Sequence, residues 1–450
     1  MADGAVADAP SRPSWVGETL DGGGSWSLRA KAPWIIGVMM LFDSWDASVM
    51  GYVLPYLRDQ WKLDSVQSGA VLSSGFMGQF FGALIFGWVA ERYGRLPVLR
   101  WLVLGMSLLG IACAMADDYV HLIALRALQG LAIGGALPIA ICYINEIAPT
   151  ATRGRFFGTF QFLMTAGFGL VALAAPRLIP NHGWPIMLAL GAAPLLVLPF
   201  TLKLPESPRW LAGRGRLDHA AQSLERLGAG ALPAATERTP IPGGGERVPF
   251  RLLFAPGVRS TFIVTALLWF LTSLVSFGMQ SWVPSLYVSM FKITKEESLQ
   301  LNQIVALSIF ILPLILRATI DRFGRRPPPL LGTAIGGVAL VAMVFISVDK
   351  TAPLVALAII GQIGISIGSM VLWPYTAETY PTRIRSLVLG TSSSIARAAS
   401  SLSPLLVGGV MQVTDGAVTP VFLVFGLPSL AVAALWLFCV RETAGRKMAD

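Results

Sequence analysis

The stretch Glu91-Arg92-Tyr93-Gly94-Arg95 recurs 230 residues later as Asp321-Arg322-Phe323-Gly324-Arg325-Arg326. A second motif, E-x-x-P-T-x-x-R, begins at Glu146 and returns at Glu378, an offset of 232 residues. Two motifs that repeat in the same order at a near-constant offset predict two similar halves that lie side by side, as in carriers built from parallel repeats.

Apolar stretches long enough to cross a bilayer surround these motifs. The chain is 54% hydrophobic and 13% charged, with a mean hydropathy of +0.65, whereas a soluble domain averages about 25% charged residues. A helix of about 20 residues spans the hydrocarbon core, and helices suit these stretches because lipid offers no partners to open backbone groups. We expect spans at 34–57, 67–90, 97–116, 119–148, 154–176, 184–202, 260–290, 299–316, 329–348, 352–377, 386–412 and 418–440.

The predicted fold is therefore an all-α membrane protein with twelve transmembrane helices in two six-helix bundles, related by a pseudo-two-fold repeat. A Gly-, Pro- and Arg-rich segment separates the sixth span from the seventh and is expected to hold a short helix near 216–227. The expected parts are an N-terminal tail (1–33), an N-terminal bundle (34–202), a linker (203–259), a C-terminal bundle (260–440) and a C-terminal tail (441–450).

The distribution of basic residues predicts the orientation. Of the 34 Lys and Arg residues, 26 fall in the two tails, the linker and the loops on the same side or within four residues of them, and 6 fall in the loops on the other side. By the positive-inside rule, both termini should lie in the cytoplasm and the protein in the inner (plasma) membrane. The pI of 9.7 then reflects topology and anionic lipid rather than a nucleic-acid partner.

Several classes of function are excluded by what the sequence lacks. Cys113, Cys142 and Cys439 all lie in apolar runs, and the three histidines form no H-E-x-x-H motif. No G-x-x-x-x-G-K-[ST] loop is present to bind a nucleotide. We therefore predict no metal, no cofactor and no enzymatic activity, and we expect a monomer whose partners are a small-molecule substrate, protons and lipid.

Charged residues inside the expected spans need a reason, because each costs about 2.5–3.5 kcal/mol on insertion scales. Asp43 and Asp46 are three residues apart in the first span and share one helix face. An aspartate in a low-dielectric cavity holds its proton, and beside an arginine it releases the proton. We predict that Asp46 and Arg126, in the fourth span, couple transport to protons, with Asp43 tuning Asp46 or carrying the proton itself. The alternative is a static ion pair that only fixes packing.

Arg397 lies near the middle of the eleventh span, and spans seven, eight, nine and eleven contain no acid. A guanidinium without a local partner is well suited to bind a carboxylate in a bidentate manner. We predict that Arg397 binds a substrate anion. The alternatives are bonds to backbone carbonyls or to Glu378, at the membrane edge.

Aromatic and polar side chains offer a place for a flat substrate. Ser273, Phe277 and Gln280 recur at helical spacing, and an aromatic ligand would stack on nearby rings. The alternatives are interface anchors for the rings and helix–helix contacts for the amides. The further candidate substrate-binding residues are Trp269, Ser273, Phe277, Gln280, Trp373, Tyr375, Gln79 and Gln161.

The repeated loops predict a latch. Acid, Arg, Gly and Arg in a short loop can join helix ends by charge-assisted hydrogen bonds, and the Gly permits a tight turn. We expect these links to hold only when the inner ends of the two bundles meet, which would stabilise the outward-open state. The alternative is topogenic charge with helix capping. The expected members are Glu91, Arg92, Arg95, Glu146, Arg153, Asp321, Arg322, Arg325, Glu378 and Arg385, and Glu206 with Glu442 forms a weaker third repeat pair, offset by 236 residues.

Together these motifs resemble those of the major facilitator superfamily over nearly the whole chain. The stretch Arg126-x3-Gly130-x3-Gly134-x3-Pro138 adds to the resemblance, and Pro205-Glu206-Ser207-Pro208-Arg209-Trp210-Leu211 resembles the sugar-porter and organic-ion branches. The family implies alternating access around a central cavity between the halves. It also supports the pairing of an acid at position 46 with Arg126.

Two stretches resemble a narrower group. Asp43-Ser44-Trp45-Asp46 is similar to the D-G-x-D signature of aromatic acid:proton symporters. The stretch from Tyr375 to Arg385 resembles bacterial nicotinate transporters and their organic-ion relatives. Departures from the family patterns are Ser44 in place of Gly, Glu91 in place of Asp and Arg317 in place of Gly.

We therefore expect proton-coupled uptake of a small organic anion, most simply an aromatic carboxylate such as hydroxybenzoate or nicotinate. A sugar or polyol porter would line its cavity with Asn and Gln, and asparagine occurs only at 145, 181 and 302. An organic-cation porter would need an unpaired carboxylate in place of Arg397. An uncoupled facilitator of the same fold and a non-transporting membrane sensor are the remaining alternatives.

Overall fold

The computed structural model describes residues 15–22, 28–234, 236, 249–291, 293–346, 351–415 and 419–442, and these residues form helices and connecting turns without a strand. The predicted all-α fold is confirmed. The N-terminal half contains α2 (Leu28–Trp61), α3 (Ser65–Tyr93), α4 (Arg95–Ala114), α5 (Tyr119–Ile147), η1 (Thr150–Thr152), α6 (Arg153–His182), α7 (Pro185–Ala189), η2 (Leu190–Ala192) and α8 (Pro194–Thr201). The C-terminal half contains α11 (Arg259–Phe291), α12 (Lys295–Phe323), α13 (Pro327–Ala342), η5 (Met343–Phe345), α14 (Thr351–Thr379), α15 (Thr382–Val413) and α16 (Thr419–Phe438).

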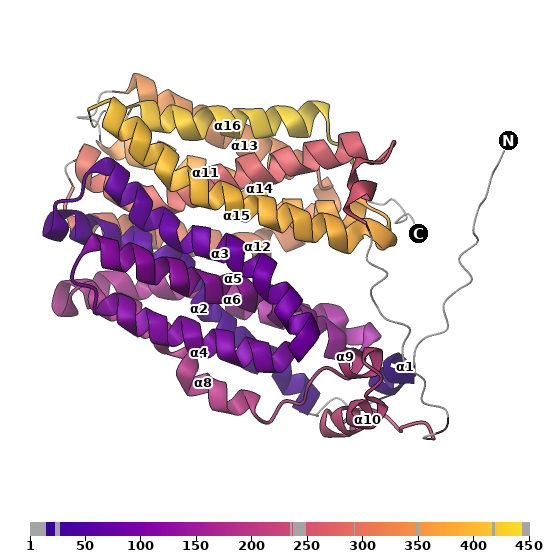
Figure 1. Ribbon diagram of the computed structural model, residues 1–450. Coiled ribbons are helices and arrows are strands. Elements are labelled where there is room, and N and C mark those ends of the chain that lie inside the picture. The colour runs from indigo at the N-terminus through magenta and orange to yellow at the C-terminus, as the bar shows by residue number, and fades with distance from the viewer. Residues whose placement is uncertain are drawn as a thin grey trace.

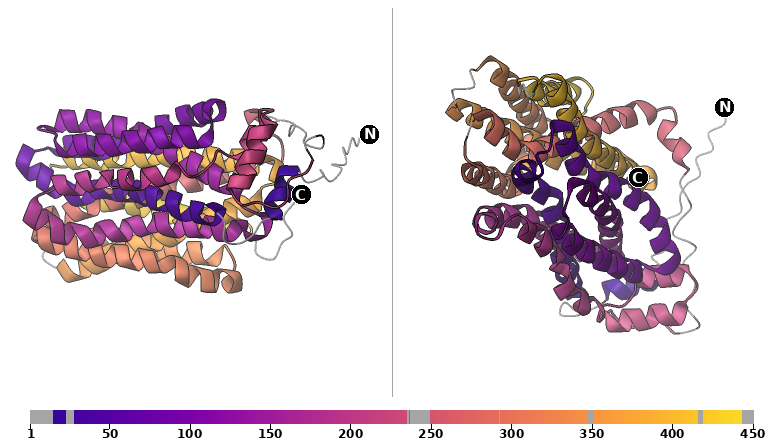
Figure 2. Two further views of the ribbon diagram at one scale, coloured as in Figure 1. Left: turned by 90° about the horizontal axis from the view of Figure 1, so that it is seen from below. Right: turned by 60° about the vertical axis from the view of Figure 1, so that its left-hand side comes forward.

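Short helices lie outside these two bundles at one end of the molecule (Figures 1 and 2). They are α1 (Trp15–Asp21), α9 (Pro208–Gly213), α10 (Leu217–Arg226) and η4 (Phe250–Phe254). The side chains of Trp15, Leu20, Leu211 and Leu224 are buried together and join α1 to the linker helices. The expected linker helix near 216–227 corresponds to α10.

Eight helices of the described part are long and apolar enough to cross a membrane: α3, α4, α5, α6, α11, α13, α14 and α16. The other four expected spans are α2, α12 and α15, which are more polar, and the α7–α8 segment. The expected helix at 184–202 corresponds to the helical segment Pro185–Thr201, which tightens into a 3-10 turn at η2 just before Pro194, a residue that has no N–H for the helical hydrogen bonds.

The two repeated loops end in the same way. Gly94, with φ +108°, and Gly324, with φ +87°, follow α3 and α12 in a conformation that L side chains rarely adopt. Glu206 accepts a hydrogen bond of 3.1 Å from the N–H of Leu96, at the start of α4. Glu442 accepts one of 2.8 Å from the N–H of Arg325, just before α13. The weak third repeat pair of the sequence is therefore a pair of matching carboxylates that cap the helix after each loop.

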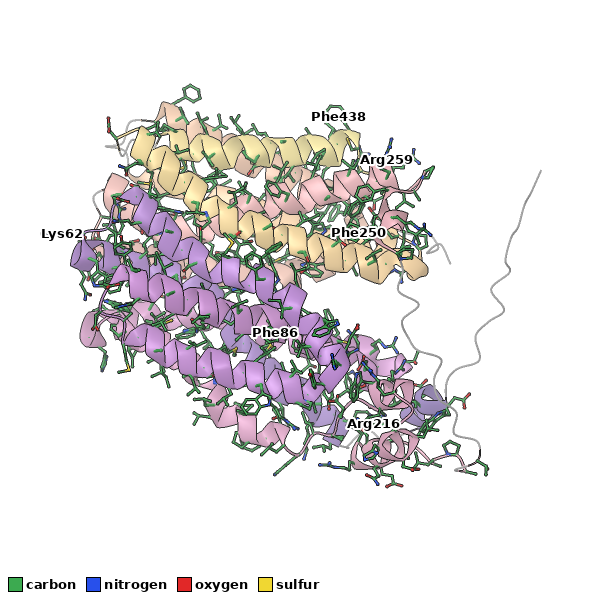
Figure 3. All side chains as sticks on the ribbon, in the orientation of Figure 1. Lys62, Phe86, Arg216, Phe250, Arg259 and Phe438 are labelled. Carbon is green, nitrogen blue, oxygen red and sulfur yellow. The ribbon has the colours of Figure 1, made fainter. Side chains whose placement is uncertain are left out.

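The two ends of the bundles differ in how the halves are joined. We call the end with the 91–95 and 324–326 loops the basic end and the other the far end; in Figure 3, Lys62 marks the far end, and Arg216 and Arg259 mark the basic end. At the far end, one hydrophobic cluster includes residues of both halves, such as Trp45 and Val53 with Trp282 and Leu286.

At the basic end, each half has a hydrophobic cluster of its own. One contains Met39 and Tyr143, and the other contains Trp269 and Trp436. The helix pairs that pack across the halves are α3 with α15, α6 with α12 and α2 with α11. The halves are therefore joined at the far end and packed separately at the basic end. In Figure 1, the ribbons of the two halves diverge towards the basic end.

Glycines make the close approach at the far end possible. A Cβ added to Gly69 of α3 would lie 2.6 Å from the carbonyl oxygen of Pro404 in α15. A Cβ on Gly51 of α2 would lie 2.7 Å from the carbonyl oxygen of Gln280 in α11. Any larger side chain at either position would push the two halves apart.

Candidate functional site

A buried ion pair joins α2 to α5 in the middle of the N-terminal bundle. Nη1 of Arg126 donates to Oδ1 of Asp46, and the two side chains are 4% and 5% exposed. Nη1 also donates to Oε1 of Gln129 over 2.8 Å. Within the described residues, Oδ2 of Asp46 and Nε of Arg126 are buried without a hydrogen-bond partner. The pair is buried from solvent, and each side chain still has one polar atom without a hydrogen bond. Each partner can therefore form a further hydrogen bond when the other is lost.

Gln129 did not emerge from the sequence as a site residue. It lies one helical turn after Arg126, and its amide donates to the carbonyl of Met106 over 3.3 Å. The sequence feature that could have identified Gln129 is its spacing from Arg126. Residues three positions apart share a helix face, so a polar side chain there can reach a membrane-embedded arginine.

Arg397 reaches across the two bundles. Its Nη1 donates to Oε1 of Gln79 over 2.9 Å, which links α15 of one half to α3 of the other. The sequence left Arg397 without an acid in its own half. The structure supplies a neutral amide from the opposite half, and Asp43 of α2 lies within electrostatic reach of the guanidinium.

Asp43 differs from Asp46 in its surroundings. It is partly exposed, while its Oδ1 is buried and accepts no hydrogen bond from the described residues. It interacts electrostatically with both Arg397 and Asp46. Two carboxyls and two guanidinium groups therefore form one cluster at mid-span, three of them from the N-terminal bundle and one from the C-terminal bundle.

The aromatic candidates fall into separate places. Trp269 is buried, its Nε1 donates to Oγ1 of Thr376 over 3.0 Å, and its ring meets that of Trp373 edge to face at 4.7 Å. The Trp373 side chain is 47% exposed. Tyr375 is buried in the core of the C-terminal bundle against Trp436, with ring centroids 5.0 Å apart.

The remaining candidates of α11 lie close to the contact between the halves. Phe277 meets Phe76 of α3 edge to face at 5.3 Å, so this pair crosses the two bundles. Ser273 is buried and Gln280 is half-buried on the same helix. Gln161 is half-buried on α6. The structure thus brings Phe277, but not Tyr375, to the contact between the two bundles.

The latch residues that the structure describes make their links within a bundle. Arg95 pairs with Glu146 at 3.4 Å, and Arg325 pairs with Glu378 at 3.2 Å. Both pairs are present although the basic ends of the halves are packed separately. The expectation that they hold only when these ends meet is therefore wrong: each glutamate ends the helix beside the repeated loop of its own half, so the arginine of that loop reaches it directly.

The other latch candidates make local contacts. The backbone carbonyl of Glu91 accepts from Nε1 of Trp210 over 2.8 Å, and the guanidinium of Arg92 lies over the Tyr93 ring at 5.7 Å. Arg385 donates to the carbonyl of Tyr380 over 3.3 Å, and Arg153 is half-buried. The side chains of Asp321, Arg322 and Arg317 lie outside the described residues.

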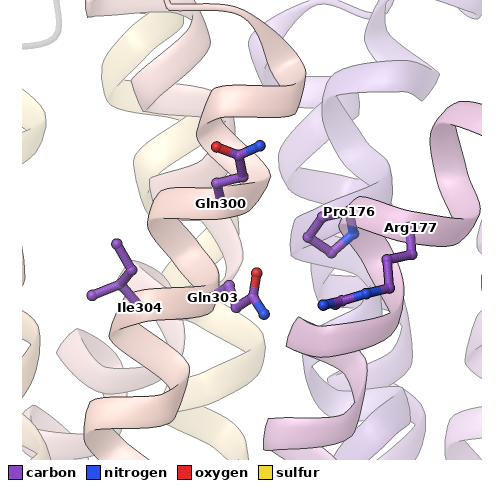
Figure 4. A pocket seen from close by; sticks show the side chains of 5 residues that line it. All are labelled: Pro176, Arg177, Gln300, Gln303 and Ile304. Carbon is purple, nitrogen blue, oxygen red and sulfur yellow. The ribbon is translucent and has the colours of Figure 1, made fainter.

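An open cavity of about 450 Å³ lies at the seam between α6 and α12. Pro176 and Arg177 line it from α6, and Gln300, Gln303 and Ile304 line it from α12 (Figure 4). None of the predicted site residues lines this cavity. It belongs to the surface between the halves rather than to the charged cluster.

Comparison with known proteins identifies the family. The profile of the family described as "Sugar (and other) transporter" matches residues 34–450. The niacin transporter NiaP of Acinetobacter baylyi is 30% identical over 92% of this chain and 94% of its own. The gallate transporter of Pseudomonas putida is 31% identical over 89% of this chain and 90% of its own.

Solved structures share the fold. The D-xylose-proton symporter superimposes with a TM-score of 0.72 at 19% sequence identity, covering 92% of this chain and 98% of that one. The twelve-helix architecture with two repeated halves is thereby confirmed. The chain belongs to the sugar (and other) transporter family of the major facilitator superfamily, and it is a multi-pass membrane transporter rather than an enzyme.

Proposed function

We propose that the protein carries a small organic anion, an aromatic carboxylate, together with a proton across the plasma membrane by alternating access. The observation that supports this most strongly is the position of Arg397. A mid-span cation of one half is hydrogen-bonded to a neutral amide of the other half and lies within electrostatic reach of a carboxyl there, so an anion bound to it would touch both moving bodies. Binding that spans two bodies changes their relative stability in different arrangements.

The preference for an aromatic carboxylate has two supports. The relatives named for niacin and gallate carry substrates that combine a ring with a carboxyl group. In this chain, Trp373 exposes 47% of its side chain beside Trp269, and Phe277 lies at the contact between the halves. A flat ring can stack or pack edge to face on such side chains.

The proton step is assigned to the pair of Asp46 and Arg126. When Asp46 is ionised, it neutralises a guanidinium that is 4% exposed. When Asp46 takes up a proton, the attraction weakens and Gln129 remains as a neutral partner for Arg126. Because a buried pair is sensitive to the charge of either member, protonation changes the packing of α2 against α5.

The two halves are packed together at the far end, and the proposed transport cycle is described from this state. By the positive-inside distribution, the basic end faces the cytoplasm and both termini lie there. The state described is then the one in which the substrate exchanges with the cytoplasm. Opening the far end would require the contacts of Gly51 and Gly69 to separate.

A sugar porter is the second candidate, because the family and the xylose-proton symporter fold both include sugars. Purified protein in proteoliposomes separates the two. With an inward proton gradient, nicotinate and 4-hydroxybenzoate should accumulate, whereas xylose and tetraethylammonium should not. Arg397→Ala should abolish carboxylate accumulation and Arg397→Lys should keep part of it, while Arg177→Ala, which removes an exposed arginine of α6, should match the wild type.

Each other outcome points to a different carrier. Accumulation of xylose alone would identify a sugar porter, and accumulation of tetraethylammonium alone would identify a cation porter. Carboxylate uptake that equilibrates but never exceeds the external concentration would identify an uncoupled facilitator. Full accumulation by Arg397→Ala would remove the anion site from Arg397.

A further inference from the structure

We propose that Asp43 is a built-in counter-ion that competes with the substrate carboxylate for Arg397, so that the site accepts the anion only once Asp43 has taken up a proton. This inference rests on the proposed function, in which the anion binds Arg397. It adds a second carboxyl with a role distinct from that of Asp46.

The first observation is that the N-terminal half already provides Arg397 with a hydrogen-bond acceptor and a nearby carboxyl group. Arg397 makes a 2.9 Å hydrogen bond to the neutral amide of Gln79 and lies within electrostatic reach of Asp43. The amide can hold the guanidinium in place without neutralising it. The charge that balances Arg397 in the empty site is therefore that of Asp43.

The second observation is that one carboxyl oxygen of Asp43 has no hydrogen-bond donor among the described residues. Its Oδ1 is buried and accepts no hydrogen bond from the described residues, yet the residue as a whole is partly exposed. By contrast, Asp46 is buried and bonded directly to Arg126. A partly exposed aspartate with an unsatisfied oxygen can exchange a proton more readily than one that is buried and bonded directly to an arginine.

The charged groups around Asp43 set the direction of the effect. They are Arg397 on α15, Asp46 on the same face of α2 and, behind Asp46, Arg126 on α5. Arg126 is held by Asp46, so Arg397 is the cation left for Asp43. A substrate carboxylate that enters places two anions beside one cation, and like charges in a site of low dielectric cannot both remain ionised at low cost.

Charge balance then links proton and anion. In the empty site, the ionised Asp43 and Arg397 sum to zero. In the loaded site, protonated Asp43, Arg397 and the substrate carboxylate again sum to zero. Each bound anion therefore brings one proton to Asp43, and linkage requires that the proton raises anion affinity by the same factor as the anion raises proton affinity.

The test measures binding and proton uptake together. Isothermal titration of the full-length protein in nanodiscs with nicotinate and 4-hydroxybenzoate, from pH 5.5 to 8, in buffers of different ionisation enthalpy gives Kd and the number of protons taken up. For the wild type we expect Kd to rise, by up to about tenfold per pH unit once Asp43 is ionised, with uptake approaching one proton per anion at the alkaline end.

Asp43→Asn should have an unusual effect for a change inside a binding site. Because it removes the competitor, the variant should bind the anion more tightly than the wild type at pH 8. Its Kd should be flat across the pH range, and it should take up no proton on binding. Asp46→Asn should keep the wild-type slope, and Asp117→Asn, at an exposed position in the turn between α4 and α5, serves as the control for loss of an acid.

The outcomes are separable. A wild type that binds carboxylates without taking up protons overturns the inference even if no variant folds. An Asp43→Asn protein that keeps the slope, or binds more weakly at pH 8, overturns it as well, and both results leave the proposed function standing. Failure of the wild type to bind any carboxylate, or undiminished binding by Arg397→Ala, removes the proposed function and this inference together.

Discussion

Nη1 of Arg397 donates a 2.9 Å hydrogen bond to Oε1 of Gln79, and this bond joins α15 of the C-terminal half to α3 of the N-terminal half. The bond explains how a guanidinium without an acid in its own half is accommodated at mid-span. It also means that any ligand of Arg397 binds at the contact between the two bundles.

The first prediction converts this amide into a permanent competitor. Gln79→Glu places a carboxylate at hydrogen-bond distance from Arg397 with almost no change in shape. We expect the affinity for nicotinate to fall at least about tenfold at pH 8, a loss of roughly 1.4 kcal/mol. The measurement is Kd in nanodiscs, with Gln222→Glu, at an exposed position on α10, as the control. Unchanged affinity in Gln79→Glu would show that the anion does not bind at Arg397.

The second prediction concerns the pair of Asp46 and Arg126. Removing one partner of a buried ion pair leaves a charge without compensation, which costs about 3–5 kcal/mol. Aspartate can escape this cost by taking up a proton, but arginine cannot lose its charge. Asp46→Asn should therefore lower the free energy of unfolding more than Arg126→Gln does, and the double variant should recover part of the loss.

Denaturant unfolding of the purified protein in detergent checks this order. The expected ranking of stability is wild type, then Arg126→Gln, then Asp46→Asn. Equal losses for the two single variants would mean that Asp46 does not take up a proton when Arg126 is absent.

The third prediction concerns the far end. Gly69→Phe puts a ring where a single Cβ would already lie 2.6 Å from the carbonyl of Pro404. The far end should then fail to close, so that transport stops while the folded protein remains. Cysteines placed at Asp59 and Lys295, which form an ion pair between α2 and α12, should form a disulfide in a protein whose native cysteines are replaced, and fail to do so with Gly69→Phe. Equal cross-linking would show that these glycines do not set the closure.

The fourth prediction concerns Glu206, which lies outside the membrane spans. Burial raises its pKa above the ordinary 4.5, although N–H groups of Ser207 and Leu96 oppose this shift. A raised pKa means that the folded state holds the proton more tightly, so this contribution to stability is full below pH 4.5 and is lost as pH rises through the folded-state pKa.

Glu206→Gln removes that loss. The melting temperature of the variant relative to the wild type should increase from pH 4.5 upwards, and Glu225→Gln, at an exposed position on α10, is the control for the loss of a carboxyl that is not buried. A relative melting temperature that falls with rising pH would show that the backbone bonds of Glu206 outweigh its burial.

The helices and the repeat could be predicted from the sequence because both are read directly from the order of residues, without knowledge of which helices pack together. Hydropathy reports the spans, and the motifs that begin at Glu91 and Glu146 repeat at a near-constant offset. The 3-10 turn before Pro194 was not predicted because the residues around it remain apolar. Hydropathy alone does not report a local change in helix type.

The partners of the charged residues were only partly accessible from sequence. The proximity of Asp46 and Arg126 could be anticipated from their depth in two spans and from family resemblance. The bond from Arg397 to Gln79 could not, because it depends on how the two halves are arranged. The latch showed the same limit: the motifs identified Arg95 and Glu146, but not that they pair within one half.

Accumulation by Asp46→Asn in proteoliposomes tests directly whether Asp46 couples transport to protons. Without a titratable group at position 46, the carrier should still exchange internal nicotinate for external nicotinate, but an inward proton gradient should raise the internal concentration far less than in the wild type, because only the proton on Asp43 remains coupled to the anion. Accumulation by Asp46→Asn at the wild-type level would contradict the assignment of proton coupling to the pair of Asp46 and Arg126.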